Sequence, residues 1–166
     1  MVISIKELVY RGQNKRGGFR LLRGKLKVMF CSFILGILLS IGVAAYAVTS
    51  DWYDIGTVYG YPYRNQAEAF LTGGGVQATT YIERSTAGNV PSGYLGAQAF
   101  MYNSSGAIYN ASNWVYNTST VHGLYQVLPS GGINGQYYYS KGLTQVWNGN
   151  GYNQYSTYRT PNVLCQ

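Results

Sequence analysis

An apolar stretch of 21 residues, from Val28 to Val48, divides this sequence into two parts of different chemical character. Eight of the twelve Lys and Arg residues lie before it, within the first 27 positions. The stretch ends in Ala45-Tyr46-Ala47, the A-x-A spacing of small residues at which signal peptidases cut. Together these features predict a secretory signal peptide over residues 1–47, with a long basic segment and cleavage after Ala47.

The length of the apolar stretch leaves a second interpretation open. As a helix, 21 residues are long enough to span a bilayer, and the cations before them favour a cytoplasmic N-terminus. Residues 28–48 would then be a signal anchor and the chain's only contact with the membrane. Both interpretations predict a hydrophobic export helix, and both place residues 48–166 outside the cytoplasm, either secreted or membrane-anchored.

The formal net charge of +7 belongs to the N-terminal segment. After Ala47 the chain has four basic and four acidic residues, so the exported part carries no net charge. Binding to nucleic acid depends largely on Lys and Arg side chains that neutralise phosphates. We therefore expect no nucleic-acid partner.

The exported part has the composition of an all-β domain. Sixteen of the 18 tyrosines lie beyond Ala47, among many Gly, Asn, Ser and Thr residues. Aromatic and β-branched residues favour strands, and clusters of Gly and Asn favour turns. The segment 76–83 has the two-residue alternation of a half-buried strand. We predict a single domain over residues 48–166, an antiparallel β-sandwich or small barrel of about eight strands.

The clearest local pattern is a hairpin over residues 93–117. Its centre, Asn103–Gly106, reads as a turn in which the glycine can adopt a positive φ. In the register that this turn sets, Met101 lies opposite Tyr109 and Tyr102 lies beside Ile108. We expect the face that carries Met101 to be the core.

The other face of this hairpin carries aromatic side chains. In the predicted register Tyr94 lies opposite Tyr116, and Gly96 lies opposite Trp114, whose ring would cover the glycine. Exposed aromatic side chains among Asn, Gln, Ser and Thr suit sugar rings or another protein. The candidate binding residues are Tyr94, Phe100, Tyr102, Trp114 and Tyr116. The competing interpretation puts Trp114 in the core and Met101 outside.

Residues for catalysis and for metal or cofactor binding are scarce in the exported part. His122 is the only histidine, which excludes a metal site of several histidines. No nucleophile motif accompanies it, and glycoside hydrolysis needs two carboxylates that flank one bond. Glu68 and Glu83 could supply such a pair only if their strands bring them together. We predict no enzyme activity, no metal and no cofactor, and a hydrolase built on His122 or on these two acids is the least favoured interpretation.

Cys165 is the only cysteine beyond Ala47, so the exported part has no intrachain disulfide. Chain ends usually have little order, so we expect a frayed tail with an incidental thiol. The alternative is a dimer linked through Cys165.

The pattern as a whole resembles small secreted proteins of Gram-positive bacteria, including bacteriocins of the lactococcin 972 type. The likeness lies in a basic and then apolar export signal, followed by a cysteine-poor β domain rich in Gly, Tyr, Ser and Asn. It implies a β-sandwich that acts at the cell envelope, and it transfers no functional residue.

From residues and resemblance together, we expect a secreted, non-enzymatic β-sandwich. Its aromatic side chains would bind a cell-wall or other glycan component, or another protein. The alternative is an antibacterial polypeptide like those bacteriocins.

Overall fold

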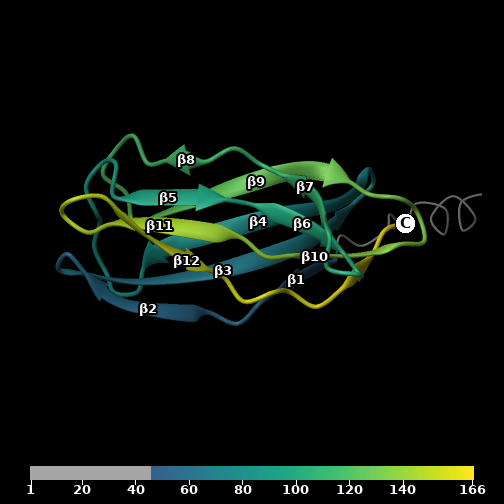
Figure 1. Cartoon of the computed structure of the whole chain (residues 1–166), viewed down its shortest axis with the longest axis horizontal. Helices are drawn as coiled ribbons and strands as arrows, with labels where there is room; N and C mark the ends of the chain where they lie inside the picture. Colours follow the sequence, from purple (N-terminus) through teal and green to yellow (C-terminus); the bar gives the residue numbers. More distant parts are fainter. Residues whose placement is uncertain (1–45) are drawn as a thin grey trace, which may run out of the picture. The chain divides into compact units, whose positions relative to one another are not determined.

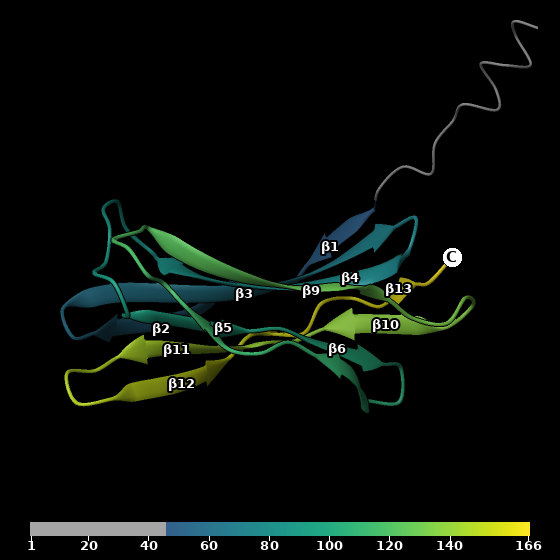
Figure 2. The same ribbon diagram turned by 90° about the horizontal axis from the view of Figure 1, so that it is seen from above.

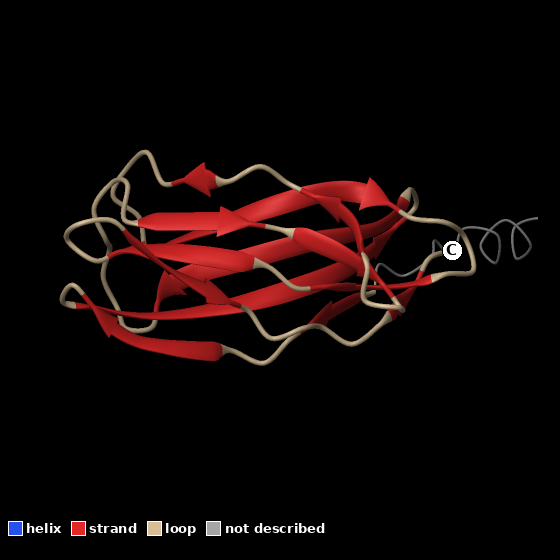
Figure 3. Ribbon diagram, in the orientation of Figure 1, coloured by secondary structure: helices blue, strands red, loops and turns tan. Residues whose placement is uncertain are grey.

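The computed structural model describes residues 46–166, which fold into strands joined by loops (Figure 1, Figure 3). The expected export helix lies outside these residues except at its end, where Ala47 and Val48 belong to the first strand and not to a helix. Ala45 of the cleavage motif also lies outside the described residues. Within the described part no helix is long and apolar enough to cross a membrane. The expectation of an all-β architecture is confirmed.

The described residues contain thirteen strands, against about eight expected. They are β1 (Ala47–Thr49), β2 (Tyr53–Val58), β3 (Tyr61–Thr72), β4 (Gly75–Arg84), β5 (Leu95–Gln98), β6 (Phe100–Asn103), β7 (Ile108–Ala111), β8 (Val115–Tyr116), β9 (Gly123–Gly131), β10 (Tyr137–Ser140), β11 (Leu143–Trp147), β12 (Tyr152–Ser156) and β13 (Val163–Leu164).

The strands form three antiparallel sheets. Sheet I has the order β1-β3-β4-β9, with β2 also paired to β3. Sheet II has the order β13-β10-β6-β7, and sheet III has the order β12-β11-β5-β8. Figure 2 shows sheet I in one layer, with sheets II and III next to each other in the second layer. None of the three sheets closes into a barrel, so the barrel alternative is wrong.

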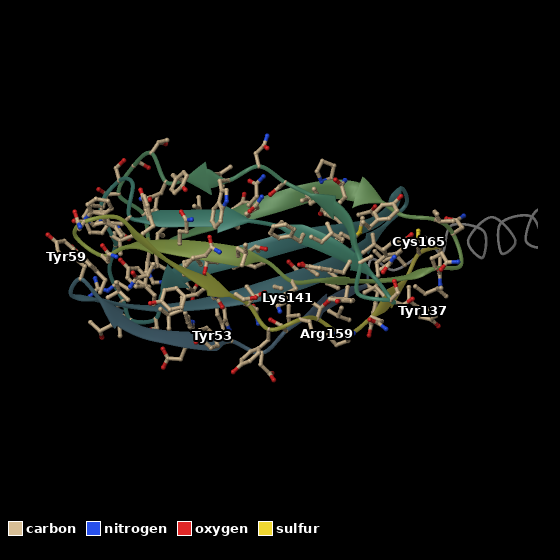
Figure 4. All side chains as sticks on the ribbon, viewed as in Figure 1. Tyr53, Tyr59, Tyr137, Lys141, Arg159 and Cys165 are labelled. Atoms are coloured by element: carbon tan, nitrogen blue, oxygen red, sulfur yellow. The ribbon has the colours of Figure 1, made fainter. Side chains whose placement is uncertain are left out.

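The second layer is divided because the chain passes between sheets II and III four times, between β5 and β6, β7 and β8, β10 and β11, and β12 and β13. Ala99 separates β5 from β6, and its N–H and C=O bond to the hydroxyl and N–H of Ser112, each at 2.9 Å. Lys141 and Gly142 separate β10 from β11, and Figure 4 labels Lys141 at this passage. Long runs that read as single strands in the sequence are therefore split, which explains the higher strand count.

Two apolar clusters fill the space between the layers. The first lies between sheets I and II and includes Ala69, Leu71, Val76, Ala78, Ala99, Met101, Leu128, Tyr138, Val163 and Cys165. The second lies between sheets I and III and includes Tyr63, Ile82, Val90, Leu95, Ala97 and Val146. The face of the 93–117 hairpin that carries Met101 is thus the core face, as expected.

A band of buried polar side chains separates the two clusters. This polar waist consists of Asn65, Thr80, Ser140 and Thr144, none of which is exposed. The amide nitrogen of Asn65 donates to Thr144 Oγ1 at 2.7 Å, which joins sheet I to sheet III. Gly142 lies so close to Thr80 that a Cβ at Gly142 would overlap Thr80 Oγ1. The two layers are therefore in direct polar contact at the waist.

The C-terminus is part of the fold, so the expectation of a frayed tail is wrong. Cys165 is 1% exposed and belongs to the first apolar cluster (Figure 4). Its N–H donates to the carbonyl of Gln136, and its carbonyl accepts from the N–H of Gly135, both at 2.9 Å. An interchain disulfide through Cys165 would first require this segment to leave sheet II.

The predicted turn of the hairpin is confirmed, but the register changes along it. Gly106 has a φ of 87°, and Tyr102 pairs with Ile108 as expected. A bulge between Met101 and Tyr102 then shifts the pairing, so Met101 lies opposite Asn110. Such a bulge places one extra residue in one strand, which turn chemistry at the hairpin tip does not reveal.

Candidate aromatic binding surface

Side chains along the strands of sheet III point alternately toward the core and toward its outer face. In β11, Thr144 and Val146 are buried, so Gln145 and Trp147 point away from the core. In β12, Tyr155 packs against the second apolar cluster, so Tyr152 and Gln154 take the outer positions. The register places Trp147 opposite Tyr152 and Gln145 opposite Gln154.

Four aromatic rings form a continuous series on this face. The rings of Trp114 and Tyr116 lie 6.2 Å apart at an interplanar angle of 22°. The ring centroids of Tyr116 and Tyr152 lie 5.2 Å apart, and those of Tyr152 and Trp147 lie 5.5 Å apart. We call Trp114, Tyr116, Tyr152 and Trp147 the aromatic strip. Tyr116 is 39% exposed and Tyr152 is 40% exposed, so the strip presents ring area to solvent.

A glycine allows Tyr116 to lie close against the sheet. Gly96 pairs with Tyr116, and a Cβ at Gly96 would be 2.8 Å from Cε1 of that ring. An aromatic ring from the neighbouring strand covers this glycine, as expected, but the ring belongs to Tyr116 and not to Trp114. The difference follows from the shifted register.

Hydrogen bonds orient the strip and place amides beside it. The hydroxyl of Tyr116 donates to Gln145 Oε1 at 2.7 Å, and Gln145 Nε2 donates to Gln154 Oε1 at 3.2 Å. The hydroxyl of Tyr152 donates to the carbonyl of Gly93 at 2.6 Å. Burial, and secondarily the neighbouring Tyr116, raise the pKa of Tyr152 above its ordinary value, so its hydroxyl stays a neutral donor. The surface combines flat apolar rings with amide donors and acceptors.

Two of the expected binding residues lie in a different cluster, on sheet II. Phe100 and Tyr102 are 6.2 Å apart, and Tyr102 stacks on Tyr139 at 5.1 Å with an angle of only 7°. The guanidinium of Arg159, labelled in Figure 4, lies 4.0 Å from the Tyr139 ring centroid. This stack covers its own sheet, and none of its ring contacts reaches the aromatic strip.

Tyr94 does not lie on the aromatic face, which corrects the expected pairing with Tyr116. Its ring contacts Tyr59 at 6.0 Å and Tyr61 at 5.8 Å, and it packs against the second apolar cluster. The alternation that predicted its direction begins only with β5, at Leu95. Tyr94 precedes the strand in a turn, where the two-residue period does not apply.

Trp147 and Tyr152 are the strip residues that sequence reasoning missed as binding residues. Their strands are joined by a tight turn, in which the N–H of Asn148 donates to the carbonyl of Gly151 at 2.9 Å. What brings them to Trp114 and Tyr116 is the pairing of β11 with β5, which joins two distant hairpins. No local pattern signals that pairing.

Comparison with models of known protein families, with curated proteins and with solved structures found no match. The candidate function therefore rests on the geometry of these side chains.

The two candidate catalytic acids, Glu68 and Glu83, are separate from each other along the sheet. His122 is exposed, and its Nδ1 is 2.8 Å from the carbonyl oxygen of Gly88. Glu83 forms an ion pair with Arg64, which lies four residues before Glu68 in β3. Four residues correspond to about 13 Å along a strand, beyond the spacing of a glycosidase carboxylate pair. Among residues 46–166 no group of three or more His, Cys, Asp or Glu side chains could hold a metal ion.

Proposed function

We propose that this chain is a secreted, non-enzymatic protein that binds a cell-envelope glycan through the aromatic strip. The observation that carries the proposal is the unbroken series of four rings on the outer face of sheet III, with two glutamine amides beside it. A sugar ring has an apolar C–H face that packs on an aromatic ring and hydroxyl groups at its edge. The strip and its amides match both parts of such a ligand.

The chemistry of the strip favours a neutral, polar ligand over a charged one. The four rings, Gln145 and Gln154 are all uncharged, and the part of the chain beyond Ala47 has no net charge. A nucleic acid would require a basic surface, and the four cations of this part are dispersed. Tyrosine and tryptophan also supply contact area at a small cost in conformational entropy, which suits recognition by a rigid sheet.

Export is the second component of the proposal. It is supported by the basic segment, the apolar stretch and the small residues at Ala45 and Ala47. The mass of the protein recovered from culture medium tests this component. A chain that begins at Val48 supports cleavage, whereas full-length protein found only in membranes supports the anchor.

A binding panel tests the glycan component. The protein is incubated with insoluble peptidoglycan, with teichoic acid and with immobilised host glycans, and the bound fraction is measured. Trp114→Ala and Trp147→Ala should each reduce binding about tenfold, since a buried aromatic contact contributes about 1 to 2 kcal/mol. Tyr137→Ala, at an exposed position of β10 in sheet II, is the matched control and should bind normally. Equal binding by the Trp114, Trp147 and Tyr137 variants would reject the strip as the site.

A further inference from the structure

The outer face of sheet I carries a hollow of 280 Å³ on the opposite side of the molecule from the aromatic strip. Its lining residues come from β3, β4 and β9, the three neighbouring strands at the centre and edge of the sheet. They are Glu68, Phe70, Gln77, Thr79, Tyr81, Tyr125 and Val127.

The hollow exists because a small residue lies between rows of large ones. Thr79 is flanked in register by Glu68 on β3 and Val127 on β9, and it is 4% exposed at the floor. On one side of this row Tyr81 pairs with Tyr125, and their ring centroids lie 6.0 Å apart. On the other side Phe70 pairs with Gln77. The tyrosines and the phenylalanine form the walls above the threonine floor.

Glu68 supplies the one charged group of the lining. Its Oε2 accepts a hydrogen bond from the hydroxyl of Tyr81 at 2.5 Å. The ion pair in the described residues joins Arg64 to Glu83, so Glu68 has no cationic partner there. No Lys or Arg lines the hollow. The Glu68 carboxylate is therefore an uncompensated negative charge beside aromatic rings.

The hydrogen bond from Tyr81 does not cancel this charge. Burial raises the pKa of Tyr81 well above its ordinary value, and the hydrogen bond and the charge of Glu68 raise it further. Tyr81 thus remains a neutral phenol that holds the carboxylate in place. The second oxygen of Glu68 has no hydrogen-bond partner among the described residues and is available to a ligand.

We propose that this hollow binds an alkylammonium group. The faces of Tyr and Phe attract cations through the ring quadrupole, and a neighbouring carboxylate adds a direct electrostatic attraction. A primary ammonium donates to the free oxygen of Glu68, whereas a quaternary ammonium contacts the rings alone. The shared chemistry is a compact organic cation on an aliphatic stem, from an amine side chain or from a choline-type headgroup.

The test titrates purified full-length protein with three small probes while tyrosine signals are followed by NMR or fluorescence. The probes are choline, n-butylammonium and 3,3-dimethylbutanol, which has the shape of choline without its charge. We expect both cations to shift the signals of Tyr81 and Tyr125, and n-butylammonium to bind more tightly than choline. The neutral alcohol should bind at least about tenfold more weakly than choline. It lacks the positive charge that the aromatic rings and the Glu68 carboxylate attract.

Substitutions locate the site and separate it from the aromatic strip. Glu68→Gln and Tyr125→Ala should each weaken cation binding about tenfold. Glu83→Gln, which removes a carboxylate from the same face, and Trp114→Ala, which alters the strip, should leave it unchanged. Unchanged thermal midpoints in these variants show that the fold is retained.

Three results would overturn the proposal. They are equal binding of choline and its neutral analogue, normal binding by Glu68→Gln, and no response to either cation. None of them bears on the glycan proposal, because the strip lies on the other layer. Loss of glycan binding in Trp114→Ala together with retained cation binding establishes two separate sites.

Discussion

Two buried tyrosine hydroxyls illustrate how differently one residue type can act in this core. The hydroxyl of Tyr138 accepts a hydrogen bond from the N–H of Ile133 at 2.9 Å. The hydroxyl of Tyr63 is buried without a hydrogen-bond partner among the described residues. A buried polar group without a partner costs about 1 to 3 kcal/mol, whereas a satisfied one stabilises by about 1 kcal/mol.

Removal of the two hydroxyls should therefore have opposite effects on stability. We expect Tyr63→Phe to raise the free energy of unfolding by about 1 kcal/mol and Tyr138→Phe to lower it by about 1 kcal/mol. Urea unfolding of the two variants beside the parent protein measures both changes. A loss of stability in Tyr63→Phe would show that its hydroxyl has a partner.

Tyr63 should also make the fold sensitive to alkali. Burial, and then the neighbouring Tyr61 and Tyr94, raise its pKa from 10.0 to about 12, against a smaller opposing effect of Arg84. Because the folded state holds this proton more tightly than the unfolded chain, the free energy of unfolding is unaffected by this group below pH 10.0 and falls as the pH rises through about 12.

Unfolding curves recorded across this range measure the effect. Tyr63→Phe should show a shallower loss of stability than the parent protein. Identical pH profiles would assign the alkaline transition to other tyrosines, for example Tyr81.

At the scale of elements, the 93–117 hairpin has a packing face and an outer face. Met101 has no exposed surface and lies in the first apolar cluster, whereas Trp114 is half-buried in the aromatic strip. Met101→Ala should lower the free energy of unfolding by about 2 to 4 kcal/mol. Trp114→Ala should cost less stability and weaken glycan binding. A larger stability loss in Trp114→Ala would place its ring in the core.

The position of Cys165 next to β13 predicts how the only thiol beyond Ala47 reacts. Because Cys165 is buried in the first cluster, a thiol reagent should modify it slowly in the folded protein and rapidly in urea. The thermal midpoint should be the same with and without reductant, since Cys165 forms no disulfide within residues 46–166. Rapid modification of the folded protein, or a midpoint that falls in reductant, would mean that β13 detaches in solution.

At the scale of the whole molecule, the polar waist sets the distance between the layers. A methyl group at Gly142 would overlap both Oγ1 and Cγ2 of Thr80, which faces it from the other layer. Gly142→Ala should therefore destabilise the protein by about 3 kcal/mol, the upper end of the usual cost of overpacking. Urea unfolding of this variant measures the loss.

A second substitution tests whether the contact across the layers is the cause. Thr80→Ala removes both of these atoms, so the double variant should recover part of the lost stability. Purely additive losses in the double variant would show that Gly142 is needed for its backbone and not for the close approach.

The sequence alone determined the features that depend on a few neighbouring residues. The two-residue alternation over residues 76–83 correctly predicted β4 as a half-buried strand, because successive side chains in a strand point to opposite sides. Asn103 and Gly106 located a hairpin turn, since the backbone there needs a residue that tolerates a positive φ. The same reasoning correctly put Met101 inside.

The tertiary structure decided everything that depends on which strands become neighbours. The bulge in β6 and a second one-residue shift between β7 and β8 together moved Tyr116 over Gly96. The pairing of β11 with β5 brought Trp147 and Tyr152 to the strip. The pairing of β10 with β13 buried Cys165, which chain position alone had marked as exposed. Strand pairing is a long-range choice, made by the total burial of apolar area and backbone hydrogen bonds, so no short segment of the sequence encodes it.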